Sequence, residues 1–216
     1  LSQEELDTLK KGTNYLWTIR YALHLIAKRP EEGLLFDHQR TLAAFFGYED
    51  NDDELAVEQF MHRYYRTAMH LSELNQTLLQ LFEQVILHAH DEDLVISINR
   101  RFELRNGRLQ ACHTNVFLRQ SSAIMEAFVI LAQNPQCHAL GAECKRLIQA
   151  HRHLIDDKYR RDIRVNSLFM ELLRSPERMS HTLLEMQRQG VLGDYLPAFN
   201  KIVGRMQHDL YHIYTV

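Results

Sequence analysis

Turn-forming and cross-linking residues are scarce in this sequence of 216 residues, which contains 8 glycines, 4 prolines and 3 cysteines. So few glycines and prolines favour long helices over a fold rich in strands and tight turns. Cys112, Cys137 and Cys144 are too few for a disulfide framework and indicate a reducing, cytoplasmic environment. No run approaches the roughly 20 apolar residues that a membrane-spanning helix requires, so we expect no membrane partner.

Neither sign of charge dominates, since 25 Lys and Arg residues and 28 Asp and Glu residues give a formal net charge of -3. A nucleic-acid partner would require a basic surface, so this balance argues against one. The sequence also lacks a glycine-rich phosphate loop, a CxxC pair and a GxSxG elbow. We therefore expect no nucleophilic catalysis by any of the three cysteines.

Apolar periodicity predicts helices along most of the chain. Residues 13–28 place Leu16, Ile19, Leu23 and Ile26 on one helical face. A longer helix is expected over residues 54–88, where apolar residues recur every 3.5 positions on average, the spacing of a seam between helices. The members of this stripe are Val57, Met61, Tyr64, Ala68, Leu71, Leu74, Leu78, Phe82 and Val85.

A single β-hairpin is predicted near residues 101–112, because polar and apolar residues alternate there on both sides of Asn106-Gly107. Further helices are expected over residues 122–133, 139–154 and 157–174, from Ser175, and from about Ala198 after a connector over 192–197. We therefore predict an all-α fold: an elongated helical bundle with one long central helix and the small inserted hairpin.

Several short segments form a recognisable set when they are taken in order along the chain. They are Leu16-Trp-Thr-Ile-Arg20, Leu23-His24, Leu35-Phe-Asp-His-Gln39, Phe60-Met-His-Arg-Tyr-Tyr-Arg66, Asn115-Val-Phe117, Gly190-Val-Leu192, Leu196-Pro197 and His212-Ile-Tyr-Thr-Val216. Together they resemble the middle region of bacterial bifunctional PII-protein uridylyltransferase/uridylyl-removing enzymes. The resemblance implies a central helical bundle over residues 1–174, following a nucleotidyltransferase domain that is missing here. It also implies a connector and the first helices of a truncated HD domain over residues 175–216.

The activity that the resemblance implies belongs to a larger parent enzyme. That enzyme transfers UMP from UTP to a tyrosine of the PII signalling protein, removes it in the HD domain, and senses glutamine through ACT domains. Mg²⁺ or another divalent metal is implied for the parent, and no cofactor for the fragment. Every catalytic residue of the family is expected outside these 216 positions, so we expect the fragment to be inactive.

Histidines near the end of the sequence are weak candidates for metal ligands. His208 and Asp209 are adjacent, as in HD hydrolases, and His212 lies one helical turn further on. Two histidines one helical turn apart do not close a metal site, which needs three or more converging ligands, and the resemblance places the family's first ligand beyond Val216. We therefore interpret His208 and Asp209 as a pair on a helix surface.

Charged and aromatic residues near the start of the chain are candidates for a contact with a nucleotide or with a neighbouring domain. Trp17, Arg20, Tyr21 and His24 share the face opposite the apolar stripe of their helix. Two interpretations stay open: the face meets the nucleotidyltransferase domain or its nucleotide, or it forms a buried polar cluster in which Arg20 pairs with Asp37. Gln39 completes the set of candidates, which is Arg20, His24, Asp37 and Gln39.

Two other functions remain possible from the sequence. The region could be a non-catalytic interaction module that binds PII or a second copy of itself. It could also belong to an enzyme similar to glutamine synthetase adenylyltransferases, which join nucleotidyltransferases to helical bundles. The sequence does not indicate an oligomeric state.

Overall fold

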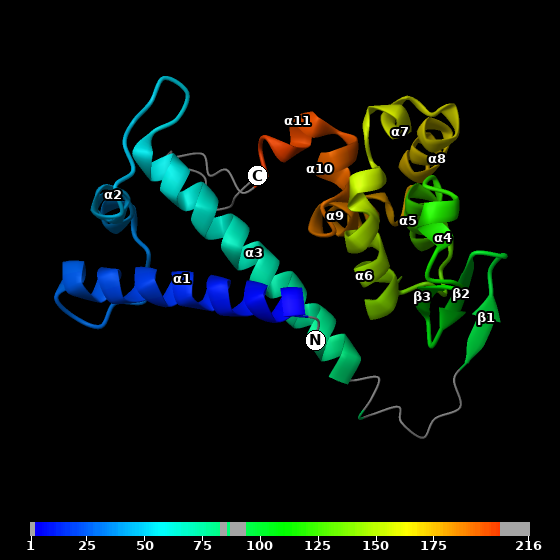
Figure 1. Ribbon diagram of the computed structural model, residues 1–216, viewed down its shortest axis with the longest axis horizontal. Coiled ribbons are helices and arrows are strands. Elements are labelled where there is room, and N and C mark those ends of the chain that lie inside the picture. The colour runs from blue at the N-terminus through cyan, green and yellow to red at the C-terminus, as the bar shows by residue number, and fades with distance from the viewer. Residues whose placement is uncertain (1–2, 83–85, 87–93, 204–216) are drawn as a thin grey trace. The chain divides into compact units, whose positions relative to one another are not determined.

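The computed structural model describes residues 3–82, 86 and 94–203 of the chain. The chain forms two compact units: the first comprises Leu1–Gln76 with Lys201–Val216, and the second comprises Thr77–Asn200. Each unit has its own buried apolar core. None of the described helices is long and apolar enough to cross a membrane. Helices account for most of the described residues (Figure 1).

The first unit is built on α1 (Gln3–Ala27), α2 (Phe36–Phe45) and most of α3 (Ala56–Phe82). Its core collects apolar side chains from all three helices, namely Ile19, Ala22, Leu23, Leu42, Ala43, Val57, Phe60 and Met61. Gly12 lets α1 and α3 pack closely, because a Cβ at this position would lie 2.8 Å from the Leu71 side chain. Helix α1 runs through Gly12 without a break.

The long helix predicted over residues 54–88 is observed as α3, which spans 27 residues to Phe82; residues 83–85 and 87–93 lie outside the described range. The apolar stripe is buried at its start, at Val57 and Met61, but Phe82 is exposed. Helix α1 is almost as long, with 25 residues. The place of one long helix at the centre of an elongated bundle stays a prediction.

The predicted hairpin is confirmed in the second unit. Strands β2 (Phe102–Arg105) and β3 (Arg108–Ala111) pair antiparallel, and Asn106 and Gly107 both have positive φ, 51° and 72°. This is the backbone geometry that a two-residue turn requires. Phe102, Leu104 and Leu109 are fully buried, so the hairpin contributes one apolar face to the core.

The hairpin belongs to a larger sheet than the sequence predicted. Strand β1 (Val95–Ser97) pairs antiparallel with β2, and β4 (Ala139–Leu140) pairs parallel with β3, which gives the order β1-β2-β3-β4. The helix predicted to start at residue 139 therefore starts later, as α6 (Ala142–His151). The backbone N–H of Gly141 donates to the Leu109 carbonyl at 2.9 Å, so pairing with a distant strand overrides the local helical pattern.

Helix α5 (Ala123–Gln133) lies at the centre of the second core, close to the range predicted from Ser122 to Gln133. It is apolar on nearly every side, as expected of a helix surrounded by protein. Helices α4 (Val116–Arg119), α8 (Ile163–Leu173) and α9 (Met179–Arg188) pack against it, and the sheet lies beside α4 and α6 (Figure 1). The other elements of this unit are the short 3₁₀ helix η2 (Arg152–Leu154), α7 (Asp157–Arg161), α10 (Val191–Tyr195) and α11 (Pro197–Asn200).

Three helix boundaries differ from prediction for local reasons. The helix expected over 157–174 divides at Asp162, whose extended backbone and side chain cap the start of α8. The helix expected from Ser175 starts at Met179, because the Ser175 hydroxyl donates back to the Glu171 carbonyl at 3.4 Å instead of capping a new helix. The connector expected over 192–197 contains α10, and the last described helix, α11, starts at Pro197.

The division into residues 1–174 and 175–216 concerns the domains of a larger enzyme and stays a prediction. The two compact units divide the chain at other places, within α3 and after Asn200.

Candidate functional site

A cluster of charged and aromatic side chains lies on the solvent side of α1. Arg20 forms an ion pair with Glu32, with its Nε 3.0 Å from Oε1 of the carboxylate. The same guanidinium lies over the Trp17 ring, 4.8 Å from its centroid, and the Tyr21 ring lies 5.7 Å from that of Trp17. The Arg20 hydrogen bond holds the pKa of the Glu32 carboxyl below its ordinary value, so this cluster carries both charges near neutral pH.

The aromatic side chains of the cluster are exposed, whereas Arg20 and His24 are half-buried and the His24 Nε2 is covered, so the cluster is not the fully buried polar group of the second interpretation. The exposed fractions are 44% for Trp17 and 62% for Tyr21. The partner of Arg20 is Glu32 and not the expected Asp37, because the turn after Pro30 brings Glu32 back beside α1. His24 joins from one turn further along, with its Nε2 3.6 Å from the Glu32 carboxylate, beyond hydrogen-bonding distance.

The other two candidates from the start of the chain lie apart from this ion pair. Asp37 is exposed in the first turn of α2, whose N-cap is Leu35. Gln39 is 5% exposed, and its Nε2 donates to the Leu34 carbonyl at 2.8 Å. Its Oε1 is buried and has no hydrogen-bond partner among the described residues. The structure thus brings Arg20 and His24 together and leaves Gln39 as a packing residue of the core.

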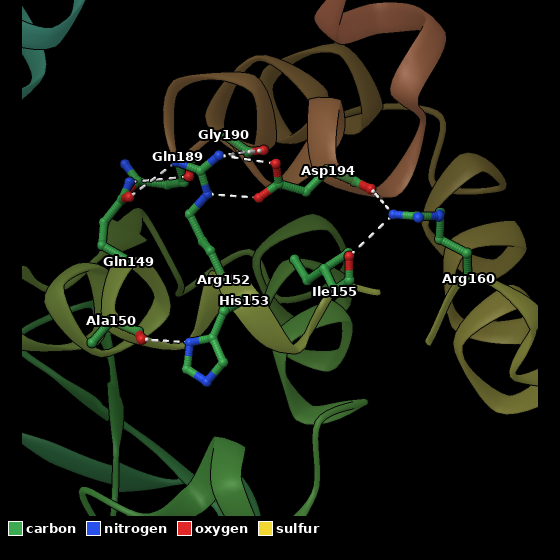
Figure 2. Close-up of polar contacts among 9 residues, drawn as sticks. All are labelled: Gln149, Ala150, Arg152, His153, Ile155, Arg160, Gln189, Gly190 and Asp194. Carbon is green, nitrogen blue, oxygen red and sulfur yellow. Dashed lines mark hydrogen bonds and ion pairs between the residues drawn. The ribbon is translucent and has the colours of Figure 1, made fainter. Parts of the chain in front are cut away.

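A second polar network, in the other unit, joins α6 and η2 to α9 and α10 (Figure 2). Arg152 makes a two-point ion pair with Asp194, with Nε 2.7 Å from Oδ2 and Nη2 3.0 Å from Oδ1. The Gln149 side-chain amide donates to the Gln189 carbonyl at 3.0 Å. Because these contacts join residues about 40 positions apart, they hold two segments of the chain in one arrangement.

Arg160 extends the network to α7. Its Nη1 donates to the carbonyls of Asp194, at 2.8 Å, and Ile155, at 3.1 Å (Figure 2). Its Nη2 donates to the exposed Asp157 carboxylate at 2.6 Å. Arg160 therefore links α7 to the backbone of α10.

The most deeply buried charges lie along the same face of α6. Lys145 and Glu185 are 3.2 Å apart, and their side chains are only 5% and 8% exposed. Gln189 donates to the Glu185 carboxylate at 3.2 Å and so satisfies part of its remaining hydrogen-bonding capacity. Lys145, Gln149 and Arg152 are spaced by four and three residues, which places them in one row on the helix. Sequence analysis did not single out this row, although the spacing is visible in it.

The metal-ligand candidates His208, Asp209 and His212 lie outside the described residues. His151 and His153 each place a ring nitrogen on a carbonyl of their own segment, at 2.7 Å for Leu147 and 3.1 Å for Ala150. No group of three or more His, Cys, Asp or Glu side chains that could hold a metal ion occurs in the part of the chain that the structure describes.

Two models of known protein families match this chain in separate segments. The model described as "GlnD PII-uridylyltransferase" matches residues 1–79, and the model described as "Uridylyltransferase GlnD third domain" matches residues 102–195. No solved structure matches the chain.

Curated relatives match along the whole chain. A bifunctional uridylyltransferase/uridylyl-removing enzyme of Pseudomonas aeruginosa (strain LESB58) is 50% identical over 216 residues. Proteins with the same description are 48% identical in Ectopseudomonas mendocina (strain ymp) and 47% identical in Pseudomonas entomophila (strain L48). Each match covers 100% of this chain and 24% of the relative, so the chain spans about a quarter of the length of the curated relatives it matches.

Proposed function

Because this chain belongs to the family of bifunctional uridylyltransferase/uridylyl-removing enzymes, we propose that it forms the helical middle part of an enzyme that attaches UMP to the PII protein and removes it. One observation carries this proposal: the matched family segments follow the two compact units. Residues 1–79 correspond closely to the continuous part of the first unit, Leu1–Gln76, and residues 102–195 fall within the second, Thr77–Asn200. Neither family description names an adenylyltransferase, so nothing here favours the adenylyltransferase alternative.

The role proposed for the chain is to hold two active sites of the enzyme at a fixed separation. The rows of ion pairs and hydrogen bonds between α6 and α9–α10 support this role, because they restrict the second unit to one packing arrangement. Transfer of UMP from UTP, hydrolysis of the UMP group, a divalent metal such as Mg²⁺ and the response to glutamine are proposed for other parts of the enzyme, in the cytoplasm.

The exposed cluster on α1 is proposed as a contact with the nucleotidyltransferase part. Aromatic side chains and arginine are the residues that most often dominate protein interfaces, and Trp17, Arg20 and Tyr21 are all accessible there. The ion pair with Glu32 holds the guanidinium in a fixed position, so the surface is ordered before a partner binds.

The test uses the full-length enzyme, with uridylylation and deuridylylation of PII measured separately. Replacing both Trp17 and Tyr21 by Ala should lower the transferase rate, while the hydrolase rate changes little. The matched control is Leu118→Ala, which truncates a similarly exposed apolar side chain on α4. Equal transferase rates for the double variant and the control would contradict the proposed contact.

Inactivity of the chain on its own is a separate test of the same proposal. The 216-residue chain, supplied with Mg²⁺, UTP and PII, should neither transfer nor release UMP. Measurable turnover in either direction would show that the chemistry resides in these residues and would refute the structural role.

A second function, binding of PII or of another copy of the chain, is favoured by one observation. Leu25 is 73% exposed and continues the line of Trp17 and Tyr21 along α1 at spacings of four residues. Such a stripe can bind a partner protein without any nucleotide. Titration of the chain with PII, and sedimentation at increasing concentrations of the chain alone, distinguish these partners from the nucleotidyltransferase part.

A further inference from the structure

One face of α3 carries two arginines and two histidines between Gln59 and His70, and Glu58 and Glu73 lie at the two ends of this face. A hollow of about 390 Å³ lies along this face, and it is lined by Gln59, His62, Arg63, Arg66, Thr67 and His70. These positions follow one another at alternating spacings of three and one residues, so they share one side of the helix. The hollow is wide open to solvent, so it suits a charged, hydrated group better than an apolar one.

Arg63 is held in place before any ligand binds. Its guanidinium lies over the Tyr15 ring, 4.7 Å from the centroid, and its Nη1 lies 3.4 Å from the Tyr48 hydroxyl. A guanidinium has five N–H donors, so most of them stay available after the contact with Tyr48. The packing against two tyrosines thus fixes the orientation of a cation whose hydrogen-bonding capacity is largely unused.

Arg66 follows three positions later on the same face and is exposed. Among the described residues it makes no ion pair or hydrogen bond with another side chain. Two cations at this spacing on a helix repel each other, and an anion bound between them would remove the repulsion. Arginine is also the residue best suited to phosphate, since its planar fork can donate two parallel hydrogen bonds.

The other polar side chains that line the hollow already have hydrogen-bond partners, so the expected class of ligand, a small anion, follows from the two arginines. His62 Nε2 lies 3.0 Å from the Val203 carbonyl, and the Thr67 hydroxyl donates to the Arg63 carbonyl at 2.9 Å, so both are already engaged. The Gln59 amide donates to the Glu49 carbonyl at 2.7 Å. The guanidinium groups are therefore the main donors, and a group with several charged oxygens close together matches them.

We propose that Arg63 and Arg66 form a binding site for a polyphosphate group, either free pyrophosphate or the phosphate chain of a nucleotide. The proposal does not depend on the proposed function, because it concerns binding to the first unit alone. Loss of binding in the test below would therefore leave the role in the larger enzyme standing.

The test is calorimetric titration of the 216-residue chain at constant ionic strength with inorganic pyrophosphate, UTP, uridine and hexaglutamate. Pyrophosphate and UTP should bind, and uridine and hexaglutamate should not. If UTP binds more tightly than pyrophosphate, the source is a nucleotide; equal affinities identify the phosphates alone as the recognised group. Binding of uridine as tight as that of UTP, or of hexaglutamate as tight as that of pyrophosphate, would overturn the proposal.

Matched arginine variants locate the site. Arg66→Gln and Arg63→Gln should each weaken pyrophosphate binding about tenfold, the effect of losing a charge-assisted hydrogen bond. Arg174→Gln makes the same change of charge at an exposed position in the second unit and should alter affinity less than about twofold. Because Arg63 packs on two tyrosines, Arg66→Gln decides the outcome if Arg63→Gln does not fold. Equal affinities of the Arg66→Gln and Arg174→Gln variants, or no pyrophosphate binding by the unmodified chain, would show that the site does not exist.

Discussion

Arg152 and Asp194, 42 positions apart, are joined by two nearly parallel hydrogen bonds, 2.7 Å from Nε to Oδ2 and 3.0 Å from Nη2 to Oδ1. Both side chains are partly buried, at 34% and 23% exposed. The Gly190 carbonyl accepts a third, longer hydrogen bond from the same guanidinium. Together with the hydrogen bond from Gln149 to the Gln189 carbonyl, Arg152 therefore fixes the end of α6 to α10 and to the turn before it.

Asp194→Ala should destabilise the second unit by about 2 kcal/mol, because it leaves the Arg152 guanidinium partly buried without its carboxylate. The measurement is urea unfolding of the 216-residue chain, with a probe confined to that unit. The control is Asp157→Ala, which removes a fully exposed carboxylate from Arg160 and should have a much smaller effect. Equal losses for the two variants would mean that the Arg152 contact does not order the turn.

Gly190 and Gly47 form a matched pair for a second test, since their φ values are 73° and 77°. A Cβ at Gly47 would meet no atom within 4 Å, whereas a Cβ at Gly190 would collide with the Arg152 guanidinium. Gly47→Ala should therefore cost about 1 kcal/mol for the backbone conformation alone, and Gly190→Ala clearly more. Adding Arg152→Ala should cost less in the Gly190→Ala background than in the unmodified chain. Thermal or urea unfolding of all four variants gives this coupling, and strict additivity would contradict it.

Local signals in the sequence predicted the parts of the fold that depend on neighbouring residues. Asn106-Gly107 specifies its turn because both residues tolerate positive φ, and α5 ends where Asn134-Pro135 cannot continue a helix. Ala139–Leu140 was predicted to be helical and forms a strand instead, because its partner, β3, lies about 30 positions earlier in the chain. No window around residue 139 contains that partner.

The candidate site could likewise be predicted only in part from the sequence. Periodicity placed Trp17, Arg20, Tyr21 and His24 on one face of α1, and the structure bears out that arrangement. The partner of Arg20 depends on the path of the turn after Pro30, which local propensity does not determine. The ion pair of Lys145 and Glu185 could not be predicted for the same reason. Each residue is common on exposed helix surfaces, and the pair forms only because two helices far apart in the sequence pack together.

The buried pair of Lys145 and Glu185 should respond to single and double substitution in opposite ways. Lys145→Met alone removes the nearer cation from the buried Glu185 carboxylate, while Arg188 stays 3.7 Å away, and should cost about 3 kcal/mol. Adding Glu185→Leu should recover most of that loss, because an apolar pair of similar volume needs no desolvation of charge. Urea unfolding of the single and double variants tests this. If the double variant is no more stable than Lys145→Met, the hydrogen bond from Gln189 to the Glu185 carboxylate contributes more to the free energy of unfolding than the ion pair with Lys145 does.

Burial of two thiols should make the second unit sensitive to alkaline pH. Burial raises the pKa of Cys144 from 9.0 to about 12 and that of Cys137 from 9.0 to about 11. Above pH 9 the unfolded chain releases these protons while the folded chain keeps them, so stability falls as pH rises toward the folded-state pKa values. The expected slope is about 1.4 kcal/mol per pH unit for each thiol. Urea unfolding between about pH 8 and pH 10.5 measures this slope.

Cysteine variants test the assignment of the slope to the buried thiols. Cys144→Ala should reduce the slope by about the contribution of one thiol, and Cys112→Ala, which removes a half-buried thiol, should reduce it less. The same slope in Cys144→Ala as in the unmodified chain would contradict this account, because the unfolded state would then gain nothing from ionising Cys144.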